Sequence, residues 1–172
     1  MTHHVFIARL IFLRVCVFAL LNSLSFTAKG VETNSKKVIL TVENWNANEQ
    51  TLTVRIQNSE SSPIRLWQRD NSWGWSNWSV SLFLADRVII YARTPAGRFT
   101  RNFPEYDEIE PGKSKTIRFD LKDGKWITAE MPVPNAGKER CGVVYYNRLS
   151  PEAARFGVWT GLAAASNIAA ER

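Results

Sequence analysis

The stretch Thr51-Leu52-Thr53-Val54-Arg55-Ile56-Gln57 decides the fold class of this chain. Its apolar residues alternate with polar ones, which is the pattern of a β-strand with one buried face. Val38, Leu40 and Val42 alternate in the same way, and the polar residues 46–49 separate the two runs. The sequence therefore predicts an antiparallel hairpin that turns one face towards a core.

Similar signals continue along the chain. Strands are expected at residues 63–67, 78–84, 88–91, 116–121 and 143–146, and a last strand at 156–160. Ser150, Pro151 and Glu152 have the order of an N-cap, a first helical residue and a first-turn acid, so they predict one helical turn. The pattern predicts an all-β protein, an antiparallel immunoglobulin-like β-sandwich of seven to eight strands, over residues 31–161. A small barrel is the alternative, and the tail 162–172 is left open between a strand extension, a helical turn and a frayed end.

Residues 1–30 are typical of a signal peptide. They contain no acidic residue, and Arg9 and Arg14 flank short apolar runs. A signal-peptide helix is therefore expected before the sandwich, with cleavage after Ser25 or after Gly30. The alternative is an uncleaved membrane anchor, but a central Arg14 costs about 3 kcal/mol in a spanning helix. This predicts a secreted protein, or one of the periplasm or cell envelope, with no transmembrane segment after cleavage.

Composition excludes several kinds of chemistry from the mature chain. The only histidines, His3 and His4, precede the apolar leader, and Cys141 is the only cysteine besides Cys16. Imidazoles and thiols supply most acid–base, nucleophilic and transition-metal chemistry near neutral pH, so we expect no metal and no cofactor. Removing Arg9, Arg14 and Lys29 lowers the formal net charge from +6 to +3, or to +4 if Lys29 is retained. This charge indicates no nucleic-acid partner.

A tryptophan-rich segment is the first candidate site. Trp67, Trp73, Trp75 and Trp78 lie among amide, carboxylate and guanidinium side chains, including that of Asn77. Exposed indoles beside polar groups suit carbohydrate, because a sugar's apolar face stacks on the ring. The alternative is that Trp67 and Trp78 belong to the core and that the other two cover a sheet edge. Asn77-Trp78-Ser79 also matches a glycosylation sequon.

A second candidate is a charged segment. Its basic part contains Arg87, Arg93, Arg98 and Arg101, and its acidic part contains Glu105, Asp107, Glu108 and Glu110. The arginines suit a polyanion and the carboxylates suit Ca²⁺. The alternative, which we favour, is a long solvated loop whose charges partly neutralise one another.

The search for catalytic groups gives only paired carboxylates. Asp107 with Glu110, or Asp70 with Asp86, would act as in glycosidases. No phosphate-binding glycine loop and no nucleophile elbow is present, and Cys141 has no histidine to activate it. We therefore expect a protein that is not an enzyme.

The chain also resembles a known group of domains. The layout of Asn58, Pro63-Ile64-Arg65-Leu66, a strand pair, Phe99, Glu110-Pro111-Gly112-Lys113-Ser114 and Phe119 is similar to secreted bacterial immunoglobulin-like domains. Within these it looks most like the group named for an intracellular proteinase inhibitor. The likeness covers about residues 50 to 121 and implies the fold. The chain departs from the group at Lys125-Trp126-Ile127-Thr128, where a Gly-x-Tyr strand is usual.

These observations together predict an exported binding or interaction domain of unidentified ligand. Its partner would be a protein or a polysaccharide, and the oligomeric state is open. The candidate ligand-binding residues are Trp73, Trp75, Asn77, Arg93, Arg98 and Arg101. A protease inhibitor acting through an exposed loop, residues 94–104, is the alternative that the resemblance favours, and a carboxylate-dependent glycosidase is a third.

Overall fold

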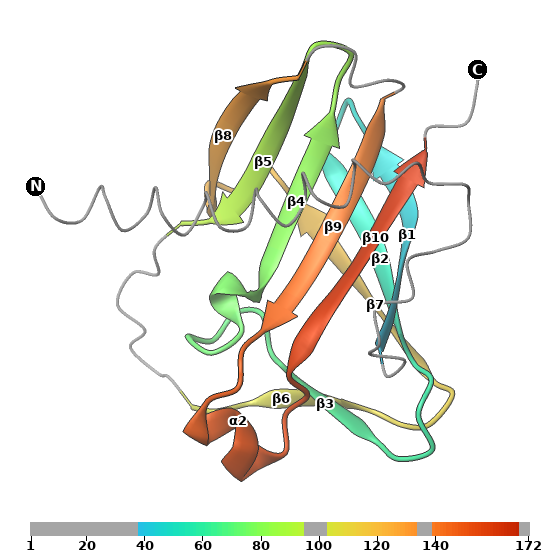
Figure 1. Cartoon of the computed structure of the whole chain (residues 1–172), viewed down its shortest axis with the longest axis vertical. Helices are drawn as coiled ribbons and strands as arrows, with labels where there is room; N and C mark the ends of the chain where they lie inside the picture. Colours follow the sequence, from blue (N-terminus) through green and yellow to red (C-terminus); the bar gives the residue numbers. More distant parts are fainter. Residues whose placement is uncertain (1–37, 95–102, 134–138, 169–172) are drawn as a thin grey trace, which may run out of the picture. The chain divides into compact units, whose positions relative to one another are not determined.

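The computed structural model describes residues 38–94, 103–133 and 139–168, which are mostly antiparallel β-strands (Figure 1). The expected leader, residues 1–30, lies outside the described residues. The strands are β1 (Val38–Asn46), β2 (Thr51–Asn58), β3 (Ile64–Trp67), β4 (Trp78–Phe83), β5 (Arg87–Arg93), β6 (Tyr106–Ile109), β7 (Ser114–Asp120), β8 (Trp126–Pro132), β9 (Arg140–Asn147) and β10 (Gly161–Ile168). A 3-10 turn, η1 (Trp75–Asn77), precedes β4, and a short helix, α2 (Pro151–Phe156), precedes β10. The all-β class is confirmed.

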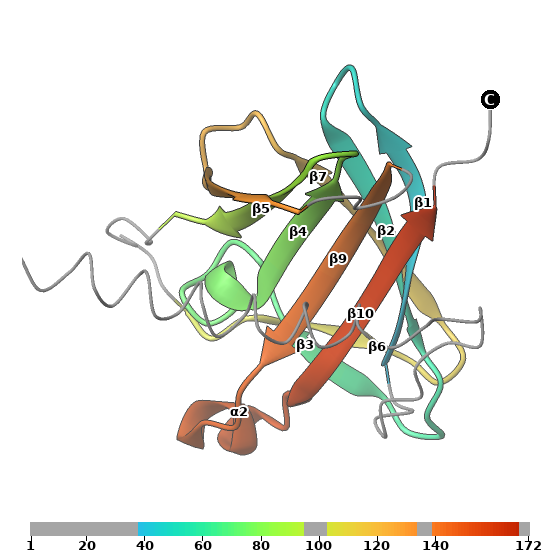
Figure 2. The same cartoon turned by 45° about the horizontal axis from the view of Figure 1, so that its top comes forward.

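The strands form two larger sheets and one small one (Figure 2). One larger sheet has the order β10-β9-β4-β5-β8, the other has the order β1-β2-β7, and β3 pairs with β6. Neighbouring strands pair antiparallel throughout, as in the predicted hairpin, where Leu40 faces Ile56. A bulge between Val42 and Asn44 shifts the register of β1 and brings Trp45 opposite Leu52.

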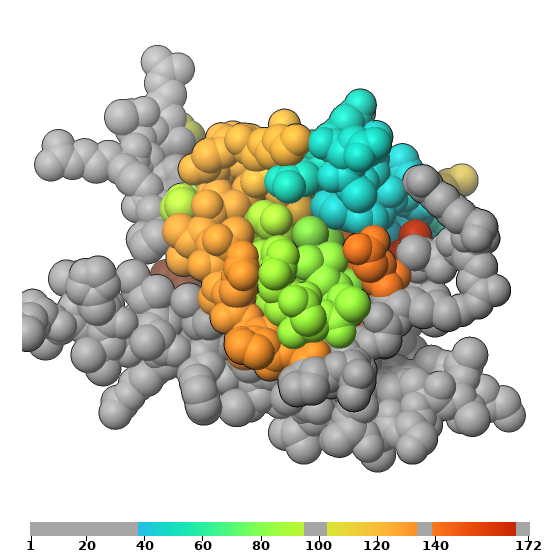
Figure 3. Space-filling model, turned by 90° about the horizontal axis from the view of Figure 1, so that it is seen from above, coloured from blue at the N-terminus to red at the C-terminus, as the bar shows by residue number. Residues whose placement is uncertain are grey.

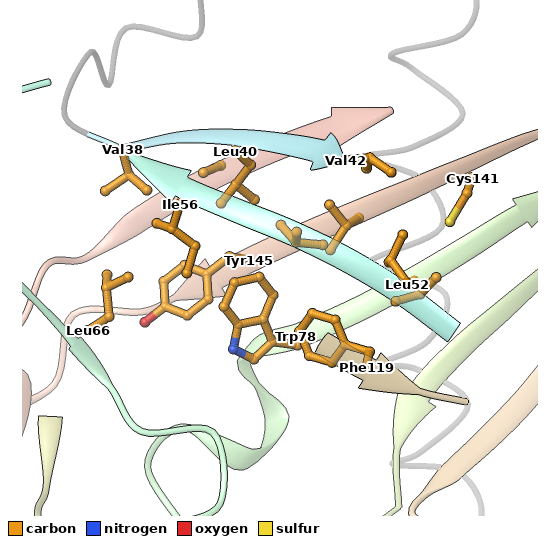
Figure 4. Close-up of a cluster of buried hydrophobic side chains, with 14 of the residues drawn as sticks. Val38, Leu40, Val42, Leu52, Ile56, Leu66, Trp78, Phe119, Cys141 and Tyr145 are labelled. Carbon is orange, nitrogen blue, oxygen red and sulfur yellow. The ribbon is translucent and has the colours of Figure 1, made fainter. Parts of the chain in front are cut away.

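The two larger sheets share one hydrophobic core (Figure 4). The predicted alternation is confirmed in β2, where Leu52, Val54 and Ile56 are at most 1% exposed. The other sheet contributes Trp78 and Tyr145, whose ring centroids lie 4.7 Å apart. Large aromatic side chains bury much apolar area each, so the core supplies stability without the need for a disulfide.

The small β3–β6 sheet is joined to the hairpin by a buried amide. The Asn58 side chain, fully buried, donates from Nδ2 to the carbonyl oxygens of Ser62, 2.9 Å away, and Ile109, 2.8 Å away. Its Oδ1 accepts a 2.8 Å hydrogen bond from the Glu60 N–H. One side chain therefore fixes the end of β2, the following loop and the end of β6.

The C-terminal third corrects the expected strand order. Residues 156–160 form no strand, because α2 ends at Phe156 and Gly157 terminates it at φ 62°, a left-handed conformation that suits glycine. The predicted helical turn is confirmed, with Ser150 accepting from the Ala153 N–H. The last strand is β10, so the strand extension is the state observed for most of the tail.

Two further strands were not expected from the sequence. β6 lies within the acidic segment, so the interpretation of that segment as a long solvated loop is wrong for residues 106–109. β8 begins at Trp126 and pairs with β5 along its whole length. The described residues therefore contain ten strands rather than seven or eight. Among these residues, no helix is long and apolar enough to cross a membrane.

Candidate ligand-binding site

The tryptophan-rich loop between β3 and β4 is held by the side chain of Asn71. Its Oδ1 accepts hydrogen bonds from the N–H groups of Trp73 and Gly74, 3.1 and 2.8 Å away, and its Nδ2 donates to the Glu105 carbonyl at 2.8 Å. Gly74 is needed here because a Cβ would lie 2.0 Å from the carbonyl oxygen of Gln68. The loop therefore has one fixed backbone path, and it presents its indoles from a rigid base.

Trp73 covers a small apolar cluster beside α2. Its ring lies 5.8 Å from that of Trp67, which is 3% exposed and makes an edge contact with Phe156. Trp73 itself stays half-buried. Trp67 and Trp78 are buried, as the alternative interpretation of this cluster expected, whereas Trp73 and Trp75 keep part of their surface in solvent.

Trp75 forms one wall of an arginine stack. The guanidinium carbon of Arg93, at the end of β5, lies 4.7 Å from the centroid of Trp75 and 4.3 Å from that of Trp126. Each indole is fixed by its N–H: Trp75 donates to the Thr94 carbonyl at 2.6 Å, and Trp126 donates to the Asp120 carbonyl at 2.8 Å. A cation between two indole faces is favourable on both sides, so η1, β5 and β8 are joined at this point.

The charge of Arg93 is only partly compensated. Its side chain is 2% exposed, and Nη1 lies 3.5 Å from a carboxylate oxygen of Asp123. Its Nε has no hydrogen-bond partner among the described residues. Burial lowers the pKa of Arg93, and Asp123 partly offsets that effect. The guanidinium is still a cation at neutral pH, so a buried positive charge lies next to the half-buried Trp75.

Only part of the predicted site is brought together. Trp75 and Arg93 are in contact, and Trp73 lies on the same loop as Trp75. Asn77 is 7% exposed and donates from Nδ2 to Asn147, so this amide faces the interior, away from glycosylation. Arg98 and Arg101 lie outside the described residues.

Trp126 and Asp123 were missed as site residues. Asp123 opens the Asp123-Gly124 turn, which the sequence does predict, and Trp126 follows that turn. Nothing in the local sequence indicates that this turn lies beside the Trp73–Trp75 loop. An indole directly after a tight turn, at the start of a strand, is the signal that could have drawn attention to Trp126. Their contact with Arg93 depends on the pairing of β8 with β5.

The acidic segment makes ion pairs rather than a cation site. Asp107 lies 2.5 Å from the Lys115 ammonium, and Glu108 lies 2.6 Å from Nε of Arg65. The hydrogen bond that Arg65 donates to Glu108 raises the pKa of Arg65. Within the described ranges, no group of three or more His, Cys, Asp and Glu side chains is placed to hold a metal ion.

The Asp70–Asp86 pair does not have glycosidase geometry. Asp86 lies in the β4–β5 turn, at the end of the sandwich that Figure 3 shows from above, with the β1–β2 turn beside it. Asp70 acts electrostatically on Arg93 at the opposite end of β5. The seven residues of β5 span roughly 20 Å. The two catalytic carboxyl groups of a glycosidase lie only about 5 to 9.5 Å apart. Of the other pair, Asp107 lies in β6 and is bound to Lys115, while Glu110 follows the last residue of that strand.

Cys141 is a core residue. Its side chain is 1% exposed, and burial raises the pKa of its thiol to about 12. The thiolate, which is the nucleophile, is therefore disfavoured at neutral pH.

The described residues thus offer one preorganised aromatic and cationic site, built from the β3–β4 loop and the facing ends of β5 and β8. Comparisons of the chain with family models, with curated proteins and with solved structures find no match, so the site is interpreted from its own geometry alone.

Proposed function

We propose that the protein is an exported, non-catalytic binding domain with an immunoglobulin-like sandwich. In this proposal residues 1–30 form a signal-peptide helix that directs the chain to the periplasm, the cell envelope or the exterior. The ligand is a surface glycan or a protein, bound at the site that contains Trp73, Trp75 and Arg93.

The observation that carries the proposal is the fixed, half-buried indole of Trp75. Its N–H is bonded to Thr94 and its ring lies against Arg93, so it has one orientation before any ligand arrives. Preorganised aromatic rings bind with little loss of conformational entropy. A sugar ring stacks on such a surface, and the neighbouring Arg69 and Asp70 provide hydrogen-bonding groups for hydroxyls.

The test is the double variant Trp73→Ala, Trp75→Ala. We expect it to stay folded and to bind at least about 30-fold more weakly, because aromatic anchors of an interface each contribute about 2 kcal/mol or more. The probes are soluble chitin, cellulose and xylan oligosaccharides and peptidoglycan fragments, screened on an array and then measured by titration calorimetry.

The matched control is Trp45→Ala. Trp45 is also partly buried against the core, and it lies on β1 opposite Leu52, outside the contacts that hold Trp73, Trp75 and Arg93. It should cost similar stability and leave binding unchanged. If the double variant unfolds while Trp45→Ala stays folded, the tryptophans are structural and the proposal fails.

Protease inhibition is the second candidate, and the anchoring of one loop favours it. The Thr94 N–H donates to the Lys125 carbonyl at 2.9 Å, and Phe103, which is 66% exposed, accepts from the Glu105 N–H at 2.8 Å. The Thr94 end of the 94–104 loop is therefore tied to the residue before β8, and at the other end the Glu105 carbonyl accepts from the Gln68 N–H at 3.1 Å, just after β3. A panel of serine, cysteine and metalloproteases tests this candidate, and absence of inhibition at micromolar protein removes it.

A further inference from the structure

Strand β8 is a free edge of the five-stranded sheet. In the strand order β10-β9-β4-β5-β8 it pairs with β5 alone, and in Figure 1 no other labelled strand lies along its far side. An edge strand leaves a row of backbone N–H and C=O groups without a strand partner, and such a row is a template for another strand. Thr128 and Glu130 are exposed, so this edge is open within the single chain.

Two hydrogen bonds fix which residues of β8 direct their backbone groups outward. The Val133 N–H donates to the Asp86 carbonyl, 3.0 Å away, and the Thr94 N–H donates to the Lys125 carbonyl, 2.9 Å away. Both bonds continue the β5–β8 register. Because the direction of the N–H and C=O groups alternates along a strand, the odd-numbered residues from 125 to 133 face β5. The backbone groups that point to the free edge are those of the even-numbered residues Trp126, Thr128, Glu130 and Pro132.

The outward groups of β8 are complementary to those of a second copy. Trp126, Thr128 and Glu130 each offer one N–H and one C=O, whereas Pro132 has no N–H to offer. When two copies of β8 run antiparallel with Thr128 opposite Thr128, Trp126 of each copy lies opposite Glu130 of the other. Each copy then donates a hydrogen bond from all three N–H groups and accepts one at all three carbonyls. Pro132 falls beyond the last pair, opposite Gly124, where a missing N–H is tolerated.

Charge also agrees with this register. Glu130 is the one charged side chain among residues 126–130, and the pairing places it opposite Trp126 rather than opposite a second Glu130. Trp126 and Glu130 have the same parity along β8, so their side chains lie on one side of the sheet. Arg93 faces Trp126 on β5, and Asp123 compensates its charge only in part. The second copy therefore brings a carboxylate towards this cation.

The other edges of the two larger sheets are less open. β1 and β10 lie beside each other, although they belong to different sheets (Figures 1 and 2). At β7, the carbonyls of Arg118 and Asp120 accept hydrogen bonds from the side chains of Arg69 and Trp126. The chain's own side chains thus occupy part of the β7 edge, and β8 is the edge that remains available among the described strands.

We propose that β8 is a pairing edge for a second copy of this chain, and that two five-stranded sheets join across a two-fold axis at Thr128 into one continuous antiparallel sheet. A two-fold axis makes the contact isologous, so it closes at the dimer and does not propagate. The contact is made mainly by backbone groups. It therefore does not depend on the ligand proposed for the Trp75–Arg93 site, and the two proposals can fail independently.

The test is the molar mass of the full-length and leader-free protein by light scattering across a concentration series. We expect a dimer for the native chain. Thr128→Pro should weaken the dimer at least about 30-fold, because each copy loses a central donor and leaves a carbonyl of the other copy unpaired. The Thr128 N–H points away from β5, so this variant keeps the hydrogen bonds of the monomer, and proline is tolerated at such edge positions.

Thr116→Pro is the matched control. The Asn58 N–H donates to the Lys113 carbonyl and the Leu121 N–H donates to the Gln50 carbonyl, so the odd-numbered residues of β7 face β2. Thr116, an exposed threonine, therefore directs its N–H to the β7 edge. Its replacement by proline should leave the dimer unchanged, as should Trp75→Ala.

A cross-link keeps the proposal falsifiable if the proline variants do not fold. Residues opposite each other in a hydrogen-bonded antiparallel pair have Cα atoms about 5.5 Å apart, which is within the range of a disulfide. Thr128→Cys, in a Cys16→Ser background and with oxidised glutathione as the oxidant, should therefore give a disulfide-linked dimer. Thr116→Cys in the same background should not. Cys141 is 1% exposed and does not compete.

Several results would overturn the proposal. They are a native protein that is monomeric at hundreds of micromolar, a folded Thr128→Pro variant that keeps the dimer, and a Thr128→Cys variant that gives no more linked dimer than Thr116→Cys. A monomer that instead binds a synthetic peptide of alternating Thr and Val, and loses this binding in Thr128→Pro, would also overturn it and assign the edge to an extended segment of another protein.

Discussion

Arg93 places a cation where water scarcely reaches. Two indole faces and one carboxylate at 3.5 Å replace its hydration, and its Nε contributes no hydrogen bond within the described chain. Buried ion pairs of this kind rarely add net stability, because desolvation offsets the attraction between the charges. Removing the charge of Arg93 and removing only its counter-charge on Asp123 should therefore change the free energy of unfolding by different amounts.

We predict that Arg93→Met changes the free energy of unfolding by less than about 1 kcal/mol, because the apolar chain fills the same slot without a desolvation cost. Asp123→Asn should cost more, about 1 to 2 kcal/mol, since it leaves the cation without a counter-charge. The asparagine keeps the hydrogen bond that Asp123 Oδ1 accepts from the Lys125 N–H, so the turn is preserved. Urea unfolding measures the free energy of unfolding of both variants. A larger loss for Arg93→Met than for Asp123→Asn would contradict this account of the stack.

Cys141 gives the fold a dependence on alkaline pH. Burial raises its pKa from 9.0 to about 12, so the native state keeps the proton that the unfolded chain releases. The associated stability is present below pH 9 and is lost as the pH rises towards 12. Burial also raises the pKa values of Tyr91 and Tyr145 in the same direction.

We expect the unfolding free energy to fall steeply above pH 9, and to fall less steeply in Cys141→Ala. Urea titrations at pH 7, 9 and 10.5 measure the two slopes. At pH 8 the native thiol should resist a disulfide reagent such as dithionitrobenzoate, and it should react once the protein is unfolded in urea. A native thiol that reacts as fast as the unfolded one would show that Cys141 is accessible.

At the scale of the elements, the strands with strict alternation could be predicted, and those with mixed composition could not. Leu52, Val54 and Ile56 have period two, and β2 forms where they predict it. Strand β6 was not predicted because Asp107 and Glu108 are typical of a solvated loop. In the fold these charges are paired with Lys115 and Arg65, which come from elsewhere in the chain. Residues 156–160 are rich in β-forming side chains, but the Ser150 cap and Gly157 favour a helix that ends at Phe156, the first of them.

Asn58 is the polar group on which three elements depend. We predict that Asn58→Ala costs about 2 to 4 kcal/mol, because it leaves the buried carbonyl of Ile109 and the carbonyl of Ser62 without this donor. Asn46→Ala is the control: that side chain caps an exposed turn by accepting from the N–H groups of Asn48 and Glu49, and its loss should cost about 1 kcal/mol or less. If urea unfolding gives comparable losses of unfolding free energy for the two variants, the three elements do not depend on Asn58.

At the scale of the whole molecule, the five-stranded sheet has two roles. Its free edge at β8 is proposed to pair with a second copy, while the candidate ligand site lies at the ends of β5 and β8. The sequence predicted half of that site, because Trp73 and Trp75 stand out by composition. It could not predict Trp126 or Asp123, whose contact with Arg93 arises only from the order in which β4, β5 and β8 pair.

Export of the whole chain is expected to remove its leader. We expect the protein recovered from the cell envelope or the medium to begin at Phe26 or Val31, because small residues precede both positions. N-terminal sequencing together with the intact mass distinguishes the two cleavage sites. A protein that begins upstream of His3 would contradict the expected removal of the leader and restore two imidazoles to the chain.

The first and last described strands, β1 and β10, lie beside each other and run in the same direction, although they belong to different sheets (Figures 1 and 2). A pulling force on the two ends of the domain would therefore enter at Val38 and leave at Ile168, at opposite ends of this strand pair. Such a load slides the two strands along each other instead of unzipping one hydrogen bond at a time. Mechanical resistance would then depend on side-chain interdigitation between β1 and β10.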